Sequence, residues 1–103
     1  MRTVSRKRIE IFVELPLLRR LLGAMDELGL PGYSLMDISG GRGGGTAWSE
    51  SGEIGNATQM VAIVSLVDHD LVGPALQRIS AIMAGRVGVA SISDVEVVVA
   101  EAH

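Results

Sequence analysis

Residues 59–67 read QMVAIVSLV and are apolar on both sides of an alternating pattern. This run ends at the polar residues Asp68, His69 and Asp70, so it predicts a central β-strand followed by the start of a helix. A strand that is apolar on both sides has two faces to cover. Helices can cover one face, and self-association is the simplest cover for the other. We therefore expect a homo-oligomer.

The residues before this strand predict a strand, a helix and a second strand. Residues 7–14 (KRIEIFVE) alternate between apolar and polar residues, which is typical of a half-buried strand. Pro16 can begin a helix, and apolar residues then recur at steps of three and four until residues 29–32 (GLPG) end the pattern. Residues 33–38 (YSLMDI) fit a short strand that leads directly into glycine.

The residues after the central strand repeat this order. Residues 71–83 have the apolar spacing of a helix, with Gly73 and Pro74 expected in its first turn, and residues 91–99 (SISDVEVVV) predict the last strand. Residues 39–58 lack apolar periodicity and predict a long loop. The sequence therefore predicts an α+β fold of the ferredoxin-like βαββαβ type, with an antiparallel sheet and both helices on one face.

Composition excludes several classes of protein. The 103 residues contain no cysteine, which excludes a disulfide framework and a cysteine nucleophile and fits a cytoplasmic location. Nine basic and twelve acidic residues, with three aromatic ones, argue against a nucleic-acid binder. No apolar stretch is long enough for membrane insertion. We expect one domain over residues 1–103.

Common catalytic motifs fail at the positions that matter. The glycine cluster at residues 40–45 is followed by Thr46 where a phosphate-binding loop needs Lys, and no helical pattern follows it for a dinucleotide fingerprint. His69 and His103 are too far apart in sequence to form a local metal pair. We therefore expect no catalytic residues, no metal site and no enzyme activity.

Residues 32–43 (GYSLMDISGGRG) resemble the PII signalling superfamily, in which the second strand ends in a Gly-rich turn that opens a long T-loop. The resemblance extends to the β-α-β order on both sides of the loop, to residues 85–88 (GRVG) at the place of the family's B-loop, and to the ending at residues 92–97 (ISDVEV). It implies a T-loop at about 39–58 and a B-loop at about 85–90. The turn is more similar to that of PII-like proteins found with bicarbonate transporters and carboxysomes.

This resemblance implies a non-catalytic homotrimer that binds adenine nucleotides in the clefts between subunits. For the bicarbonate-associated subgroup it implies AMP, ADP or cyclic AMP as the effector, sometimes with bicarbonate, and no required cofactor. It also implies regulation of a partner in inorganic-carbon uptake, such as a bicarbonate transporter or a carboxysome-related protein.

The resemblance assigns the nucleotide-binding residues to three segments. The base or ribose would lie beside Ser34, Leu35, Met36 and Asp37, the phosphates near Ser39, Gly40, Gly41, Arg42, Gly43, Arg86, Val87 and Gly88, and the neighbouring subunit would supply Thr58, Gln59 and Met60. Arginine forks and glycine amides suit phosphate oxygens.

Three departures from the classical members narrow this expectation. The single tyrosine, Tyr33, lies on the second strand, so the family's T-loop nucleotidylation is not expected. Gly43 stands where those members have the glutamine that holds 2-oxoglutarate. Arg86 replaces two B-loop lysines, so a triphosphate would be poorly neutralised.

Two other interpretations share this fold. A metal-handling trimer of the copper-tolerance type is disfavoured because the chain has no cysteine and no cluster of His and Met. A structural trimer would instead dock onto a partner through the Gly-rich loop, with Trp48 as a buried anchor. The alternative for Trp48 is that it folds back on its own sheet.

Overall fold

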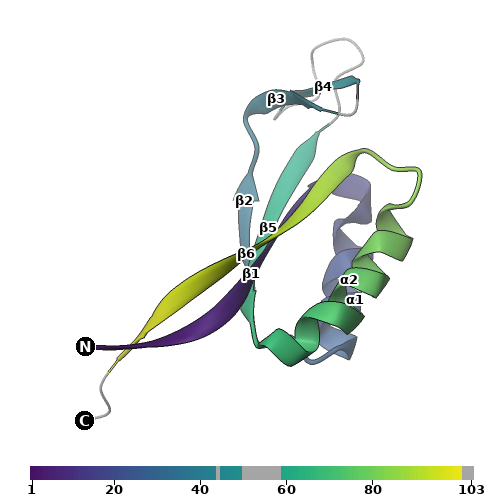
Figure 1. Cartoon of the computed structure of the whole chain (residues 1–103). Helices are drawn as coiled ribbons and strands as arrows, with labels where there is room; N and C mark the ends of the chain where they lie inside the picture. The colour runs from purple at the N-terminus through teal and green to yellow at the C-terminus, as the bar shows by residue number, and fades with distance from the viewer. Residues whose placement is uncertain (44, 50–58, 101–103) are drawn as a thin grey trace.

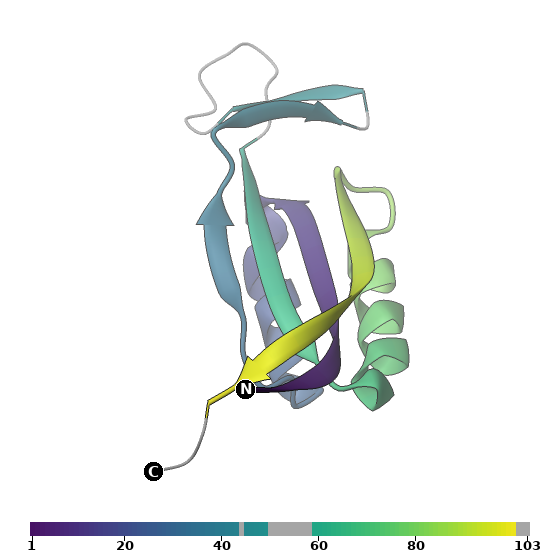
Figure 2. The same ribbon diagram turned by 60° about the vertical axis from the view of Figure 1, so that its left-hand side comes forward.

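The computed structural model describes residues 1–43, 45–49 and 59–100 and contains two helices over one face of a four-stranded sheet (Figures 1 and 2). The elements are β1 (Arg2–Glu14), a 3-10 turn (Leu15–Leu17), α1 (Leu18–Glu27), β2 (Ser34–Asp37), β3 (Gly40–Gly43), β4 (Thr46–Ser49), β5 (Met60–Val67), α2 (His69–Met83) and β6 (Gly88–Val99). The sheet has the antiparallel order β2-β5-β1-β6. This arrangement confirms the α+β, ferredoxin-like fold. No helix within these residues is both long and apolar enough to cross a membrane.

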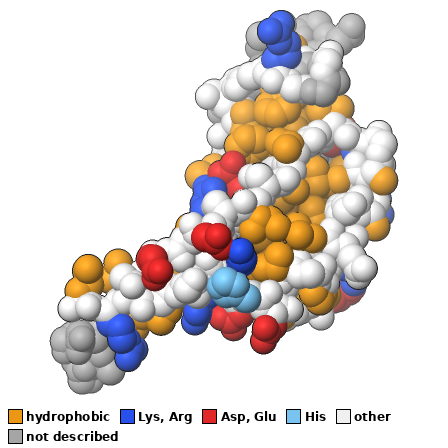
Figure 3. All heavy atoms as spheres, viewed as in Figure 1, with side chains coloured by type: hydrophobic (Ala, Val, Ile, Leu, Met, Phe, Trp, Pro, Cys, Tyr) orange, Lys and Arg blue, Asp and Glu red, His pale blue; other side chains and the backbone are white. Residues whose placement is uncertain are grey.

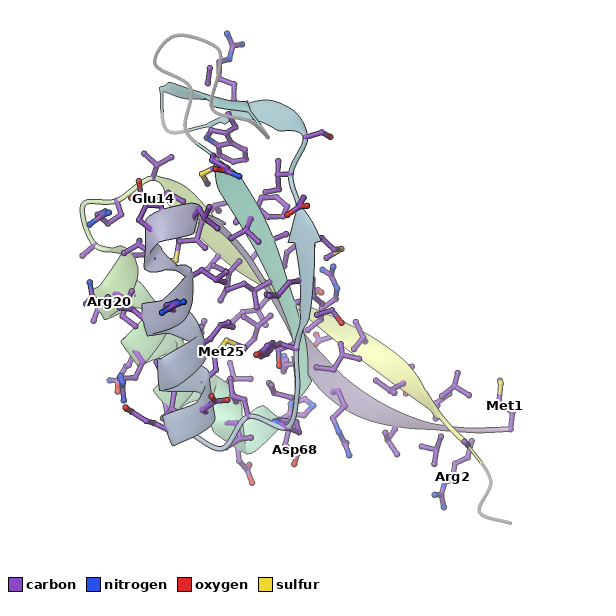
Figure 4. The ribbon with its side chains drawn as sticks, turned by 180° about the vertical axis from the view of Figure 1, so that it is seen from behind. Met1, Arg2, Glu14, Arg20, Met25 and Asp68 are labelled. Atoms are coloured by element: carbon purple, nitrogen blue, oxygen red, sulfur yellow. The ribbon has the colours of Figure 1, made fainter. Side chains whose placement is uncertain are left out.

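The core lies between the helices and one face of the sheet. Alternation in β1 turns Ile9, Ile11 and Val13 to this side, where Ile11 is in register with Ile63 and Val13 with Val61. Leu21 and Met25 of α1, and Ala75 and Ile79 of α2, are buried against them, and Met25 is seen pointing toward the sheet in Figure 4. Each large apolar side chain buried here contributes about 1.5–3 kcal/mol to the free energy of unfolding.

The opposite face of the sheet, which we call the open face, has no helix over it in the described part of the chain. Met60 of β5 is buried on this face, but Met36 and Val89 are 46% and 51% exposed. Figure 3 shows hydrophobic side chains gathered directly below the hairpin formed by β3 and β4. The two-sided apolar pattern of residues 59–67 is explained by this arrangement, because the helices cover one side and the hairpin covers only part of the other.

Strands β1 and β6 are both longer than their apolar patterns predict. Residues 2–6 pair with residues 95–99 as a two-stranded ribbon that extends past the rest of the sheet, toward the labelled Met1 and Arg2 in Figure 4. The expected start of β1 at residue 7 was therefore wrong. The expected start of β6 at residue 91 was also wrong, because residues 88–90 pair with residues 11–13 at the other end of that strand. Backbone pairing does not need apolar alternation, and ion pairs support the ribbon end of the sheet. Arg6 contacts Asp68 at 3.0 Å, and a hydrogen bond from Lys7 lowers the pKa of Asp94.

Two further expectations are corrected. Helix α2 begins at His69, so Pro74 lies in its second turn, where its missing N–H leaves the Asp70 carbonyl without the usual helical donor. The segment at residues 39–58 was expected to be a loop without secondary structure, but β3 and β4 pair as a hairpin. Pairing of Gly-rich strands leaves no apolar alternation to detect, because the glycines have no side chain. Residues 50–58 of that segment lie outside the described residues.

Gly88 begins β6, so the connection from α2 is shorter than the expected B-loop at 85–90. A Cβ at Gly88 would lie 2.3 Å from the Phe12 carbonyl oxygen and 2.9 Å from Met83 Cε, and the φ angle of Gly88 is +150°. This position therefore needs glycine both for its conformation and for the close approach of β6 to β1.

We expect Gly88→Ala to lower the free energy of unfolding by about 2 kcal/mol, because the added methyl group must displace backbone. Gly23→Ala is the matched control: a Cβ there meets nothing within 4 Å, and alanine should raise helix stability by roughly 0.5–1 kcal/mol. Urea denaturation measures both. Equal stability of Gly88→Ala and the wild type would contradict this role of Gly88.

Candidate functional site

One end of the sheet, beneath the β3–β4 hairpin, brings together segments far apart in the sequence (Figure 1). Asp37, Val61, Val13 and Gly88 are in register across the four strands. The end of β2, the start of β5 and the start of β6 therefore meet in one row, which we call the hairpin end of the sheet. Three of the segments assigned to the nucleotide by the resemblance converge there.

Arg86 is held at the hairpin end by a carboxylate that sequence reasoning missed. Its Nε donates to Glu14 Oε1 at 2.6 Å, and its backbone N–H donates to the Met83 carbonyl at 2.9 Å. The Glu14 side chain is 16% exposed and that of Arg86 is 42% exposed. In Figure 4, Glu14 lies beside the loop between α2 and β6. Arg86 is therefore already paired, and a phosphate there must share or replace Glu14.

Glu14 gave no signal in the sequence beyond its place in an alternating strand. It is 72 positions from Arg86, and its own register partner is Met60 of β5. The backbone contact from Leu15 N–H to the Gln59 carbonyl, at 3.0 Å, extends this pairing beyond the strand. Only the strand order brings Glu14 between the two expected segments.

The hairpin is attached to the open face by Trp48. The Trp48 ring lies edge-on to Phe12 of β1, with centroids 6.2 Å apart and planes at 78°. A Cβ would lie 3.3 Å from the ring at Gly41 and 2.7 Å from it at Gly43, so the bare glycine backbone forms the other side of the contact. Trp48 Nε1 is buried without a hydrogen-bond partner in the part of the chain described here. In this structure Trp48 therefore lies against its own sheet, as in the second of the two interpretations.

A separate pocket lies at the start of β2, at the end of this strand that is far from the hairpin. The pocket has a volume of about 480 Å³ and lies on the open face, with Arg8, Tyr33, Ser34, Val64 and Leu66 among its lining residues. The buried Ser65 hydroxyl donates to the Gly32 carbonyl at 2.5 Å and so fixes the turn before β2. We call this the Ser34 pocket.

A single chain does not bring all the expected nucleotide-binding residues together. The hairpin end of the sheet holds Asp37, Gln59, Met60, Arg86, Val87 and Gly88, and the hairpin itself holds Gly40, Gly41, Arg42 and Gly43. Ser39 lies between β2 and β3, Ser34 lines the other pocket, and Leu35 and Met36 lie on β2 between Ser34 and Asp37. Thr58 lies outside the described residues. Four residues of extended strand span about 10 Å. The Ser34 pocket and the paired Arg86 are thus separate in one chain, and we call them the two candidate half-sites.

In the described ranges no group of three His, Asp or Glu side chains is arranged to hold a metal ion. Arg42 of β3 is exposed and lies in register with Ala47. The hairpin and the hairpin end of the sheet thus carry groups of the kind that can bind an anion: glycine backbone amides and Arg42 on the hairpin, and Arg86, paired with Glu14, at the end of the sheet.

We expect Gly43→Ala to move Trp48 away from the open face, because the new Cβ would lie 2.7 Å from Trp48 Cζ2. Trp48 is the single tryptophan, so its emission reports on this contact. The emission should shift to the red and become more accessible to acrylamide, and loss of the aromatic pair should cost about 0.5–1.5 kcal/mol of stability. Gly23→Ala serves as the control, and unchanged emission of Gly43→Ala would contradict the contact.

The comparisons with known proteins agree on one family. The family model for nitrogen regulatory protein P-II matches residues 6–102. The fold is similar to that of CPII, a nitrogen regulatory PII-like protein from Thiomonas intermedia K12, in a structure bound to ADP, AMP and bicarbonate, with 22% identity, 93% of this chain and 91% of that chain covered, and a TM-score of 0.82. The apo form of CPII is also similar, with 21% identity, 93% of this chain and 95% of that chain covered, and a TM-score of 0.75.

A PII-like signalling protein from Thermus thermophilus is also similar, with 26% identity, 95% of this chain and 94% of that chain covered, and a TM-score of 0.73. No similar sequence was found among curated proteins. Since the family model covers nearly all of the chain, and the fold has the strand order and Gly-rich hairpin described above, the chain belongs to the nitrogen regulatory protein P-II family.

Proposed function

We propose that this protein is a non-catalytic, cytoplasmic PII-like regulator that forms a homotrimer and binds AMP, ADP or cyclic AMP between its subunits. Bicarbonate is a second ligand in this proposal, and the regulated partner acts in inorganic-carbon uptake, as a bicarbonate transporter or a carboxysome-related protein. The observation that carries the proposal is the hairpin end of the sheet, where Arg86 is held by Glu14 below the Gly-rich strand β3 (Figure 1), in a member of the P-II family.

The two half-sites support binding between subunits. The Ser34 pocket is at one end of β2, while Arg86 is at the other end of the sheet. A nucleotide that used both groups of residues within one chain would have to span the length of β2. A second copy that brought its own pocket against the hairpin end would complete the site at close range.

The open face supports self-association. Met36, Leu66 and Val89 are exposed hydrophobic residues on one side of the sheet. A flat apolar surface of this kind is unfavourable in water and favours an interface. A second and third copy would cover it while the helices stayed on the outside of the assembly.

The charges at the hairpin end favour a nucleotide with one or two phosphates over a triphosphate. On the phosphate side of the proposed cleft the arginines are Arg42 and Arg86, and Glu14 already pairs with Arg86. Arg8 of the Ser34 pocket is likewise paired, with Glu10. A monophosphate or diphosphate can be balanced by these groups, whereas each further charge left unpaired in a partly desolvated cleft costs on the order of 1–3 kcal/mol. Bicarbonate, a small anion, is compatible with the same groups.

The β3–β4 hairpin, within the proposed T-loop at about 39–58, offers a route from nucleotide to partner. Its base adjoins the end of β2, and it is held by one aromatic contact of Trp48 with Phe12. A ligand that orders the glycine backbone of β3 therefore changes the segment presented to a partner.

In a nucleotide titration by calorimetry, we expect AMP or ADP to bind at least as tightly as ATP. Glu14→Gln should increase the affinity for ADP by about threefold to tenfold and the affinity for ATP by more, because Arg86 loses its competing carboxylate. Arg42→Ala and Arg86→Ala should each weaken ADP more than they weaken adenosine.

Asp94→Asn is the matched control, since it releases Lys7 from an ion pair on another part of the sheet and should leave the ADP affinity unchanged. ATP binding tenfold tighter than ADP would overturn the placement of the phosphates. Unchanged ADP binding in both arginine variants would do the same. Weaker ADP binding in Glu14→Gln would mean that Glu14 positions Arg86 for the phosphate instead of competing with it.

Sedimentation velocity at micromolar concentration should give a trimer for the wild type. Leu66→Glu should shift it toward monomer, because a charge would be buried on the open face. Gln77→Glu adds the same charge on the exposed side of α2 and should leave the trimer intact. A monomeric wild type would contradict the proposed assembly.

A further inference from the structure

A second candidate site lies on the helices, away from the hairpin end of the sheet. The two helices enclose a groove of about 480 Å³. Arg19, Arg20, Gly23 and Glu27 of α1 line one side, with Arg78 and Ala81 of α2 on the other. We call it the helix groove. Arg20 is seen in Figure 4 on the side of α1 that faces away from the sheet.

The helix groove is basic although the chain carries a net charge of -3. Arg78 donates to Glu27 at 2.8 Å, and this ion pair joins the two helices. Neither Arg19 nor Arg20 has a carboxylate within 4.0 Å among residues 1–43, 45–49 and 59–100. They also stand in the first turn of α1, which has no acidic residue and where positive charge opposes the helix dipole. No ion pair among the described residues therefore accounts for these two arginines.

The packing of the described residues also gives no reason for a glycine at position 23. It lies in the interior of α1, where glycine is less stable than alanine. A Cβ at Gly23 would meet nothing within 4 Å, and its φ angle is not in the left-handed region. Neither conformation nor space demands glycine at this position. Its bare backbone, facing Ala81 across the groove, leaves room for the main chain of another molecule.

We propose that the helix groove docks an acidic segment of a partner protein. Aspartate or glutamate carboxylates of that segment would bind the guanidinium groups of Arg19, Arg20 and Arg78, which suit paired carboxylate oxygens. Its backbone would pass over Gly23 and Ala81. A peptide is favoured over a compact anion because small, uncharged residues separate the arginines of α1 from Arg78 along the floor. The groove remains on the outside of an assembly built through the open face.

Fluorescence polarisation with the full-length chain tests this proposal. The probe is a fluorescein-labelled peptide of alternating Glu and Ala, and the same peptide with Gln in place of Glu is the neutral reference. We expect the acidic peptide to bind and the neutral peptide not to bind. Arg19→Gln combined with Arg20→Gln should weaken it by about tenfold. Gly23→Leu, which changes no charge and keeps a good helix former, should weaken it by roughly fivefold by filling the floor.

A variant that carries Arg2→Gln and Arg6→Gln is the matched control, because it removes the same charge from β1. It should change the affinity for the peptide by less than about twofold. Calorimetry should show unchanged ADP affinity in all groove variants, which separates this site from the nucleotide site. Circular dichroism confirms that each variant is folded.

Three results would overturn the proposal. An equal loss in the β1 control would show that the peptide responds to overall charge. Normal binding by Gly23→Leu would show that the peptide does not lie along the groove. Displacement of the peptide by inorganic phosphate or ADP at their own binding concentrations would show that the groove takes small anions and is not a peptide site.

Discussion

The position of β1 between β5 and β6 is the constraint on which the rest of the structure depends. Its alternation sends Ile9, Ile11 and Val13 into the core. The alternate residues face away from the core, and three of them contact a part of the proposed function. Arg8 lines the Ser34 pocket, Phe12 meets Trp48, and Glu14 holds Arg86. One strand therefore sets the core on one side and positions both half-sites and the hairpin on the other.

This arrangement explains how tightly the site depends on register. A shift of β1 by one residue would exchange its two faces, placing charged residues in the core. The same shift would separate Phe12 from Trp48 and Glu14 from Arg86. The close approach of Gly88 to the Phe12 carbonyl opposes such a shift, because a Cβ at that point would clash with the β1 backbone.

The fold could be predicted because it follows from local patterns. Alternation at residues 7–14 and the apolar run at 59–67 identify two central strands, and apolar spacing identifies both helices. The β1 half of the ribbon, residues 2–6, was missed because Val4 is its one apolar residue, whereas its partner residues 95–99 were part of the predicted last strand. The hairpin of β3 and β4 was missed for a related reason, since glycines show no alternation.

The candidate site could be predicted only as a list of residues. Their identity came from a resemblance, whereas their grouping depends on the strand order, which brings Glu14 to Arg86 from 72 positions away. No local pattern in the sequence indicates such a contact. The position of Trp48 was left between two alternatives for the same reason: its partner Phe12 is distant in sequence, and a contact with glycine has no side-chain signature.

The glycines separate into those that the fold requires and those that it does not. Gly88 and Gly43 are required, because a Cβ would clash with the Phe12 backbone at the first and with the Trp48 ring at the second. Gly23 has neither reason, and it lies where glycine costs helix stability. In a protein of marginal stability, a residue that lowers the stability of the folded chain is expected where it contributes to binding another molecule. This difference supports two separate proposed anion-binding surfaces: one on the hairpin side of the sheet, near Arg86, and one on the helices, where no contact among the described residues accounts for Gly23, Arg19 and Arg20.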